Sequence, residues 1–427
     1  MTLYPLKFNS ILKSKVWGGD KLPAFKSIDY SGEPLGESWE LSAVPGDDSV
    51  VAEGPLKGKT LPELIDAFGV DLLGRKGSAA SDGRAPEAKK CVDASGTLPP
   101  ASSASLTPRG AEQGDYAPRN VTAAGFPLLF KFIDAGDDLS VQVHPDDEMA
   151  RRRGFPFGKT EMWYVVDAEP GARLFSGFSV PTKAEEFRSL ALDGGIMERL
   201  GSYEVHPGDV FFLPAGRVHA IGRGCFVAEI QQSSDCTYRI YDYNRPGLDG
   251  RPRALHIDDA LEATDFSVVE NAKSHPDVPL NTLTPIVSCP YFNVSVLHAA
   301  SVLTPCGAEQ GDYAPQNVNT ASSRAQTAED RGWAASTPYS AERPLSSGGR
   351  ADAAKAWLTV PCKAGESFTV LMCTEGCAEI ETGIPADGPT KGHRTELRRG
   401  ETLMIPACAT SLKVLPSPEA NLLVVSL

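Results

Sequence analysis

The sequence predicts a mainly β protein that contains two barrels and few short helices. Short apolar stretches such as EMWYVVDA, DVFFLPAG and CFVAEIQQ follow one another between turn residues, which is typical of all-β sandwiches and barrels. The 427 residues include 40 Gly and 34 Pro, a composition that favours turns over long helices. Similar stretches return after residue 355, in SFTVLMC, ETLMIPA and NLLVVSL, which indicates a second barrel.

One sequence frame occurs in both predicted barrels. The segment GDVFFLPAGRVH, residues 208–219, has the same spacing of Gly, Pro and apolar residues as GETLMIPACATS, residues 400–411. The first copy ends in His219, whereas the second ends in Ser411. We therefore predict one barrel with a functional site and one degenerate barrel that has lost it.

Composition divides the chain into segments. Two stretches are rich in Ala, Ser, Pro and Gly and poor in large apolar residues, so we expect disordered insertions at 76–125 and 305–354. The segments predicted to fold are an N-terminal part that packs on the first barrel, 1–75, the first barrel itself, 126–265, and the second barrel, 266–304 with 355–427.

The composition also limits the partners and the location of the protein. A formal net charge of −14 repels nucleic acid and anionic lipid, so neither is an expected partner. No apolar run reaches the roughly 20 residues that cross a bilayer, and MTLYPLKFNS has no signal-peptide pattern. The nine cysteines are scattered without a C-x-x-C pair, which favours reduced thiols. We therefore expect a cytoplasmic protein. Because the protein as a whole repels anions, any anionic ligand would have to be held by a few Lys or Arg side chains gathered at its site.

Three segments supply candidate metal ligands. In LSVQVHP, Ser140, Gln142 and His144 alternate with apolar residues and so share one strand face, although a strand facing solvent explains this pattern equally well. Glu161 opens the run EMWYVV, and His219 follows the turn PAGRV. Two imidazoles and one carboxylate with an open position are the usual ligands of a catalytic metal, and Gln142 could add a neutral oxygen.

Candidate cations accompany these residues. Lys159 shares a strand face with Glu161, and Arg239 and Arg245 have the same parity in TYRIYDYNR. A guanidinium group suits planar, bidentate recognition of an oxyanion such as a phosphate. Surface arginines on an edge strand are the alternative interpretation, and it is a stronger one for Arg245 than for Arg239.

Together these motifs resemble the type I mannose-6-phosphate isomerase (phosphomannose isomerase) family, in its compact bacterial branch. The matching segments are GESWELS, FPLLFKFIDA, LSVQVHPDD, GKTEMWYV, GDVFFLPAGRVHAIG and EIQQSSDCTYRIYDYNRP. They cover 1–75 and 126–260, and the two predicted insertions interrupt none of them. The resemblance implies a cupin barrel, a double-stranded β-helix of jelly-roll type, followed by a degenerate cupin-like barrel.

The resemblance further implies an aldose–ketose isomerase that depends on one zinc ion per chain. The family's zinc ligands fall on His144, Glu161 and His219, and Gln142 matches a fourth ligand of longer relatives. The implied substrate is a sugar phosphate, because the family interconverts mannose 6-phosphate and fructose 6-phosphate. A proton moves between C2 and C1 through a cis-enediol(ate), with zinc as the electrophile.

Other positions of the family's site also have matches in this chain. Arg239 matches the catalytic arginine, and Glu229 matches an active-site carboxylate. Ser140, Lys159 and Arg245 match positions that contact the substrate or its phosphate. The base that moves the proton stays open between Glu229, a hydroxide on the metal and another residue.

Two functions of other classes use similar residues. Two histidines and one carboxylate also describe the facial triad of a non-haem iron dioxygenase, although the candidate phosphate cations and Gln142 argue against it. A non-enzymatic sugar-binding cupin would need no group that stabilises an enediolate. Metal analysis together with a turnover assay separates these alternatives from an isomerase.

Overall fold

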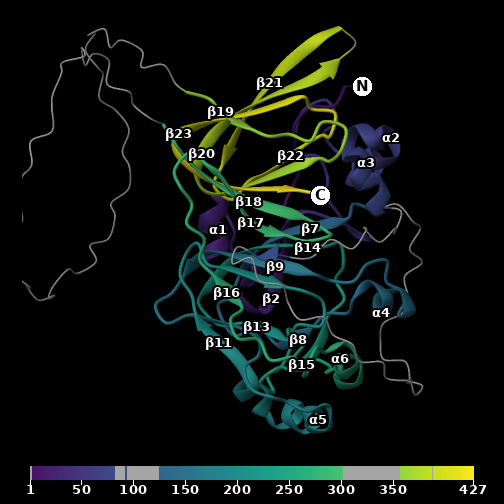
Figure 1. The fold of residues 1–427 in the computed structure, drawn as a ribbon, viewed down its shortest axis with the longest axis vertical. Helices are drawn as coiled ribbons and strands as arrows, with labels where there is room; N and C mark the ends of the chain where they lie inside the picture. Colours follow the sequence, from purple (N-terminus) through teal and green to yellow (C-terminus); the bar gives the residue numbers. More distant parts are fainter. Residues whose placement is uncertain (1, 82–91, 94–124, 302–355, 387) are drawn as a thin grey trace, which may run out of the picture. The chain divides into compact units, whose positions relative to one another are not determined.

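The computed structural model describes residues 2–81, 92–93, 125–301, 356–386 and 388–427 (Figure 1). The described residues up to 301 and those from 357 onward form one compact unit. Strands make up 43% and helices 16%, so the prediction of a mainly β chain is confirmed. Each of the six α-helices among the described residues has at most 12 residues, in agreement with the expected short helices.

A seven-stranded antiparallel sheet forms one wall of the first barrel. Its order is β16-β12-β9-β14-β7-β3-β2. The strands are β2 (Ile11–Gly19), β3 (Leu35–Leu41), β7 (Leu128–Asp134), β9 (Glu161–Ala168), β12 (Val210–Leu213), β14 (Cys225–Gln232) and β16 (Lys273–Ser274). Strands β3, β7 and β14 are buried along their whole length because both faces of the sheet are covered.

A five-stranded antiparallel sheet forms the opposite wall. Its order is β11-β10-β13-β8-β15. The strands are β8 (Val141–Val143), β10 (Arg173–Phe178), β11 (Leu200–Glu204), β13 (His219–Ile221) and β15 (Tyr238–Tyr241). Trp163 and Phe211 from the first sheet pack with Leu174 and Ile221 from the second in one core cluster. On the other face of this sheet, α5 (Ala184–Asp193) and α6 (Ile257–Ala263) pack through a separate apolar cluster.

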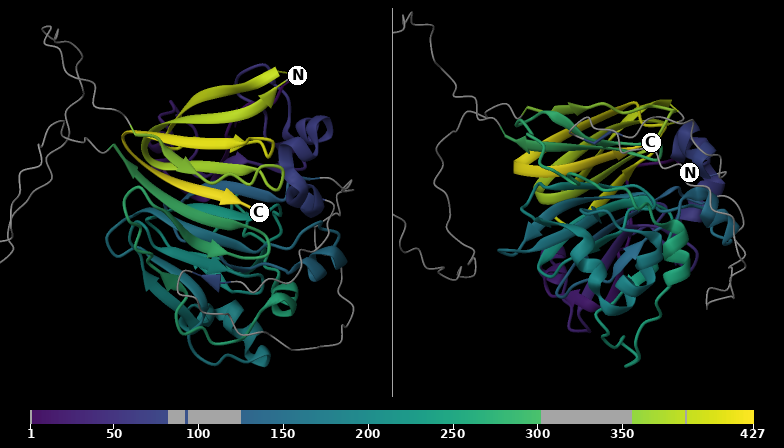
Figure 2. Two further views of the ribbon diagram at one scale, coloured as in Figure 1. Left: turned by 45° about the horizontal axis from the view of Figure 1, so that its top comes forward. Right: turned by 60° about the horizontal axis from the view of Figure 1, so that its bottom comes forward.

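A nine-stranded sheet builds the second barrel. Along its main path the order is β1-β22-β20-β23-β18-β17-β6, with β19 on β23 and β21 on β20. The strands are β1 (Leu6–Lys7), β6 (Val92–Asp93), β17 (Leu283–Ser288), β18 (Asn293–Ala300), β19 (Leu358–Val360), β20 (Thr369–Ala386), β21 (Gly388–Arg398), β22 (Thr402–Ile405) and β23 (Ser411–Ser426). In both views of Figure 2 its green and yellow strands lie next to the teal strands of the first barrel.

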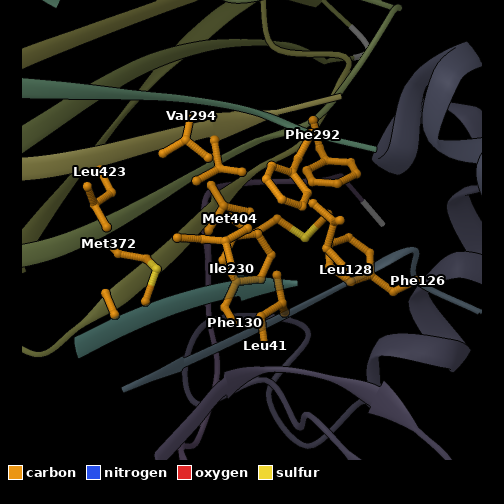
Figure 3. Packing of buried hydrophobic residues seen from close by; sticks show 14 of the residues in the cluster. Leu41, Phe126, Leu128, Phe130, Ile230, Phe292, Val294, Met372, Met404 and Leu423 are labelled. Carbon is orange, nitrogen blue, oxygen red and sulfur yellow. The ribbon is translucent and has the colours of Figure 1, made fainter. Parts of the chain in front are cut away.

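The two barrels share an apolar interface (Figure 3). Phe130 and Ile230, on the outer face of the seven-stranded sheet, pack in one cluster with Met372, Met404 and Leu423 of the nine-stranded sheet. All five side chains are fully buried. Because each large apolar side chain contributes about 1.5–3 kcal/mol when it is buried, this interface holds the wall of the first barrel firmly against the second.

The N-terminal segment contributes to both barrels. Strands β2 and β3 extend the seven-stranded sheet, whereas Leu6 of β1 pairs with Met404 of β22. The remaining helices are α1 (Lys21–Lys26), α2 (Leu61–Phe68), α3 (Val70–Ser81) and α4 (Asp147–Arg152), and the two-stranded sheet is β4 (Ala43–Val44) with β5 (Asp47–Asp48). Thr60 and Glu63 form a capping box at the start of α2.

The predicted insertions coincide largely with parts of the chain for which no structure is described. Of 76–125, the structure describes only 76–81, 92–93 and 125, and residues 76–81 continue helix α3. The other predicted insertion, 305–354, lies outside the described residues. Among the helices of the described segments, none combines the length and the apolar character that crossing a membrane requires.

Candidate metal and substrate site

A row of polar side chains crosses the inner face of the five-stranded sheet. Gln142 of β8 stands opposite His219 of β13 and Arg239 of β15, so the three side chains point to the same face. Ser140 and His144, two positions to either side of Gln142, share that face. Ser140 and His144 are buried, which decides between the two interpretations of this strand: its polar face points into the protein.

The opposite wall carries a second group of polar side chains. Glu161, the first residue of β9, stands opposite Gln231 of β14. One pleat further on, Glu229 of β14 stands between Trp163 of β9 and Lys131 of β7. Our sequence analysis did not assign Lys131 to the site. It is the one charged residue among the apolar residues 128–133 of β7, and this isolated charge was the signal that could have revealed it.

His144, Glu161 and His219 form a cluster that could hold a metal ion. One ligand atom from each residue lies within 4.8 Å of the others. His144 Nε2 lies 3.5 Å from one carboxylate oxygen of Glu161, and His219 Nε2 lies 3.1 Å from the other. All three side chains are buried, and they come from three separate strand ends that the barrel brings together.

The hydrogen bonds of the two imidazoles determine which nitrogen faces the cluster. His144 Nδ1 lies 2.9 Å from the carbonyl oxygen of Cys236, and His219 Nδ1 lies 2.8 Å from that of Arg217. A carbonyl oxygen only accepts, so each Nδ1 carries the hydrogen and each Nε2 presents a lone pair. Burial and the nearby Lys159 ammonium lower the pKa of both histidines, that of His219 to about 3, so both rings are neutral at pH 7.

The cluster therefore brings the lone pairs of two imidazole nitrogens and one carboxylate close together, and one carboxylate oxygen has no hydrogen-bond donor. Glu161 Oε1 is buried, accepts no hydrogen bond and faces the lone pair of His219 Nε2. Burial raises the pKa of Glu161 to about 7, because it disfavours the charged carboxylate. A proton on Oε1 would also relieve the conflict between the two facing lone pairs. A divalent cation would relieve it as well, and the donor set of two nitrogens and one carboxylate fits such an ion.

Lys159 and Gln142 complete the surroundings of this cluster. Lys159 Nζ lies 2.8 Å from His144 Nε2 and also contacts Glu161 Oε2. A metal ion bound to these two atoms would therefore take the place that the ammonium group holds here. Gln142 Nε2 lies 3.2 Å from His219 Nε2, and rotation of the amide would present its oxygen to the cluster instead.

Glu229 belongs to a buried ion pair. Lys131 Nζ lies 2.8 Å from Glu229 Oε2 and 2.7 Å from Gln231 Oε1, and Trp163 Nε1 donates to Glu229 Oε1 at 2.9 Å. Burial alone would raise the pKa of Glu229, but Lys131 and Lys159 lower it below its usual range. Burial acts to lower the pKa of Lys131, but the nearby carboxylates, mainly those of Glu229 and Glu37, together raise it. Both partners are therefore charged at neutral pH.

The two candidate arginines have different surroundings. Arg239 lies beside Gln142 in the polar row, and its Nη1 donates to the carbonyl oxygen of Ala254 at 2.8 Å. Arg245 follows β15 and makes ion pairs of 3.1 Å with both Asp137 and Asp242. The structure thus brings Arg239 beside Gln142, one of the candidate metal ligands, whereas it places the Arg245 guanidinium between two carboxylates.

Comparisons with known proteins identify the family. No family model matches the chain. Mannose-6-phosphate isomerase of Streptococcus mutans is 35% identical over 292 residues, which are 68% of this chain and 77% of that protein. Mannose-6-phosphate isomerase ManA of Bacillus subtilis is 34% identical over 297 residues, 69% of this chain and 79% of that protein. The chain belongs to the mannose-6-phosphate isomerase family.

Solved structures agree with this assignment at the level of the fold. The crystal structure of the Bacillus subtilis mannose 6-phosphate isomerase matches with a TM-score of 0.64 and 23% identity over 99% of both chains. A putative mannosephosphate isomerase from Archaeoglobus fulgidus matches with a TM-score of 0.59 and 18% identity, over 100% of this chain and 98% of that one. The predictions of a cupin-type fold and of a mannose-6-phosphate isomerase, an aldose–ketose isomerase, are confirmed. The alternatives of a non-enzymatic cupin and an iron dioxygenase are not retained.

Proposed function

We propose that this protein is a zinc-dependent enzyme that interconverts mannose 6-phosphate and fructose 6-phosphate through a cis-enediol(ate). The observation that supports this most directly is the buried cluster of His144, Glu161 and His219, whose lone pairs meet at one point inside the barrel. A barrel interior that only had to be stable would not carry this arrangement, because burying charged and polar groups costs free energy, and Glu161 Oε1 accepts no hydrogen bond here.

Zinc is the metal that best suits this donor set. Two imidazole nitrogens and one carboxylate leave a position open, as in catalytic zinc sites, and Gln142 would be a fourth ligand after its amide rotates. A mannose 6-phosphate isomerase with the same fold is described as bound with zinc and yttrium, at a TM-score of 0.56 and 14% identity. When bound, zinc supplies positive charge that polarises the sugar carbonyl and stabilises an enediolate. We propose one ion per chain.

Arg239 is the residue that we propose to act on the reacting carbons. It lies beside Gln142 on the polar row, and it is half-buried, which strengthens its interaction with any charge nearby. Its guanidinium would stabilise negative charge that develops on O1 and O2 as the proton leaves C2. Ser140, buried on the same face, would hold a sugar hydroxyl.

Lys159 and Arg245 are the proposed phosphate ligands. The Lys159 ammonium, once it leaves the ligand atoms of His144 and Glu161, would be available to an anion. Arg245 is already paired with two carboxylates, the exposed Asp137 and the buried Asp242. A phosphate oxygen could therefore bind Arg245 only in place of Asp137, since a buried carboxylate cannot move away into solvent. Binding of the phosphate at Arg245 would therefore be weaker than at an unpaired arginine.

Glu229 is the proposed carboxylate for proton transfer between C2 and C1. It is ionised, as a base must be, but its oxygens accept hydrogen bonds from Lys131 and Trp163. To take the proton from C2, one oxygen would have to exchange such a bond for the substrate. If Glu229 is the base, Glu229→Gln should abolish exchange of the C2 hydrogen with solvent deuterium. Retained exchange would show that another group moves the proton.

The central experiment pairs metal analysis with an isomerase assay on the full-length protein. We expect about one zinc per chain, loss of mannose 6-phosphate turnover after chelation, and recovery when zinc is returned. Fully metal-free protein that isomerises at the original rate would contradict the proposal.

A further inference from the structure

The segment that leads into β9 carries both Lys159 and Glu161, and its backbone is held by groups from other parts of the first barrel. Lys159 N donates to the carbonyl oxygen of Pro145 at 3.0 Å. Thr160 N donates to Gln232 Oε1 at 2.8 Å, and Gln232 N donates in turn to Thr160 O at 3.1 Å. The backbone between the two functional side chains is therefore fixed on both sides, which sets the direction in which each of them leaves the chain.

Asp147, the first residue of α4, holds this segment through its side chain. Its Oδ1 accepts hydrogen bonds from Gly158 N at 2.8 Å and from Gln232 Nε2 at 2.9 Å, and its Oδ2 accepts one from the hydroxyl of Tyr291 at 2.9 Å. Tyr291 lies between β17 and β18, so this last bond comes from the second barrel. One carboxylate thus connects α4, the segment before β9, the end of β14 and the second barrel.

The neighbouring Asp146, and not Asp147, caps α4. The Asp146 side chain accepts a hydrogen bond from Met149 N at 2.8 Å. The donors to Asp147 are all neutral, so within the described residues this carboxylate acts as a hydrogen-bond acceptor for separate segments. The close approach of Gly158 agrees with this role. A Cβ atom there would lie 2.5 Å from the carbonyl carbon of Asp146 and 2.6 Å from Asp147 N, so a larger residue would displace the backbone.

We propose that Asp147 is a positioning residue of the metal site, which fixes the segment before β9 so that the Glu161 carboxylate meets the two histidines. This inference rests on the zinc site of the proposed function. Glu161 is the first residue of β9, so the hydrogen bonds of residues 158–160 determine where its carboxylate points. Removal of a group that orients a metal ligand typically weakens metal binding by about 10- to 100-fold.

The test measures the zinc dissociation constant of the full-length protein by competition with a chromophoric chelator. Asp147→Ala should raise this constant about tenfold or more. Asp147→Asn keeps an oxygen that accepts from Gly158 and Gln232, and its amide can donate to the hydroxyl of Tyr291, so its constant should stay within about threefold of the parent value. Gly158→Ala displaces the same segment without removing a polar group, and it should weaken zinc binding about tenfold as well.

Asp146→Ala is the matched control. It removes the neighbouring carboxylate and with it the cap of α4, so it should lower the melting temperature but leave the zinc dissociation constant unchanged. Melting of the metal-free protein verifies that each variant is folded.

Three outcomes would overturn the inference while the proposed function stands. A folded Asp147→Ala or Gly158→Ala variant could bind zinc as tightly as the parent, Asp147→Asn could lose as much affinity as Asp147→Ala, or Asp146→Ala could weaken binding equally. A parent protein that binds no zinc would instead contradict the proposed function, and this inference together with it.

Discussion

The two barrels differ in what they enclose. The first surrounds charged and polar side chains, among them His144, Glu161 and Glu229, whereas the second surrounds an aliphatic cluster that includes Ile380 and Leu412. In the described residues from 283 onward, every buried polar residue is Ser or Thr. The structure thus contains one barrel with a polar site and one with an almost wholly apolar interior.

The shared sequence frame lies at equivalent places in both barrels. In the first, β12 leads through the turn PAGRV to His219, the first residue of β13; in the second, β22 leads through PACAT to Ser411, the first residue of β23. The framework of strand and turn survives without the histidine. The comparison shows that the shared Gly and Pro spacing is sufficient to form the strand and turn of a barrel. A site needs polar residues such as His219 in addition, and the barrel itself does not require them.

The largest expected effect concerns the metal ligands. His144→Ala, Glu161→Ala and His219→Ala should each lower turnover by about 1,000-fold or more and reduce zinc content, because the cluster loses one of three donors. Ser411→Ala, at the position in the second barrel that corresponds to His219, should leave both unchanged. Zinc analysis and steady-state kinetics test this. Normal zinc content in His219→Ala would remove the basis for treating the two barrels as different.

The buried ion pair of the first barrel should respond strongly to the loss of one partner. Lys131→Met leaves the carboxylate of Glu229 buried without its counter-charge, at an expected cost of about 3–5 kcal/mol in the free energy of unfolding. Adding Glu229→Gln to Lys131→Met should restore most of this. Urea unfolding measures both variants. If the double variant is no more stable than the single one, the two charges do not compensate each other.

The aliphatic interior of the second barrel should affect stability but not the metal. Ile380 is fully buried, so Ile380→Ala should cost about 3 kcal/mol in the free energy of unfolding. Zinc content should stay the same, since His144, Glu161 and His219, the candidate ligands, belong to the first barrel. Loss of zinc in the folded variant would show that the interior of the second barrel takes part in holding the site.

The two arginines test how far the polar site extends within the first barrel. Arg239→Ala should lower kcat about 100-fold with little change in KM, because the lost interaction strengthens in the transition state. Arg245→Ala should raise KM about tenfold and reduce the preference for mannose 6-phosphate over mannose. The substitution does not leave the buried Asp242 carboxylate without a partner, because Arg253 also donates to it. Arg239→Lys should recover only part of the rate. Steady-state kinetics on mannose 6-phosphate and mannose test both variants. An Arg239→Ala enzyme with unchanged kcat would show that the roles of the two arginines are reversed.

The smallest expected effect is the response of the metal-free protein to acid. The folded-state pKa of His219 is about 3, below the ordinary value of 6.5, so as the pH falls below 6.5 the unfolded chain binds a proton that the folded barrel does not. Stability is therefore present above pH 6.5 and lost on acidification, by about 1 kcal/mol for this group between pH 6 and pH 5. Urea unfolding of chelated protein measures it. His219→Gln should show a shallower pH dependence, and an identical slope would contradict the assignment.

Local patterns account for most of what the sequence predicted correctly. Period-two alternation placed Ser140, Gln142 and His144 on one strand face, and the frame around His219 distinguished the two barrels. Alternation could not show whether that face points inward, because solvent and a polar cavity favour the same residue types. Lys131 was missed because pairing across strands β7 and β14, which are 98 residues apart at this contact, supplies its partner.

The sequence by itself determined the fold class, the presence of candidate metal ligands in the first barrel, and the identities of those candidates. These follow from short-range spacing, which a linear chain displays directly. Only the tertiary structure decided that His144, Glu161 and His219 meet, that Lys159 shares their space, and that Asp137 and Asp242 hold Arg245. Such contacts depend on sheet register and on the burial of charge, which arise only when distant strands pack together.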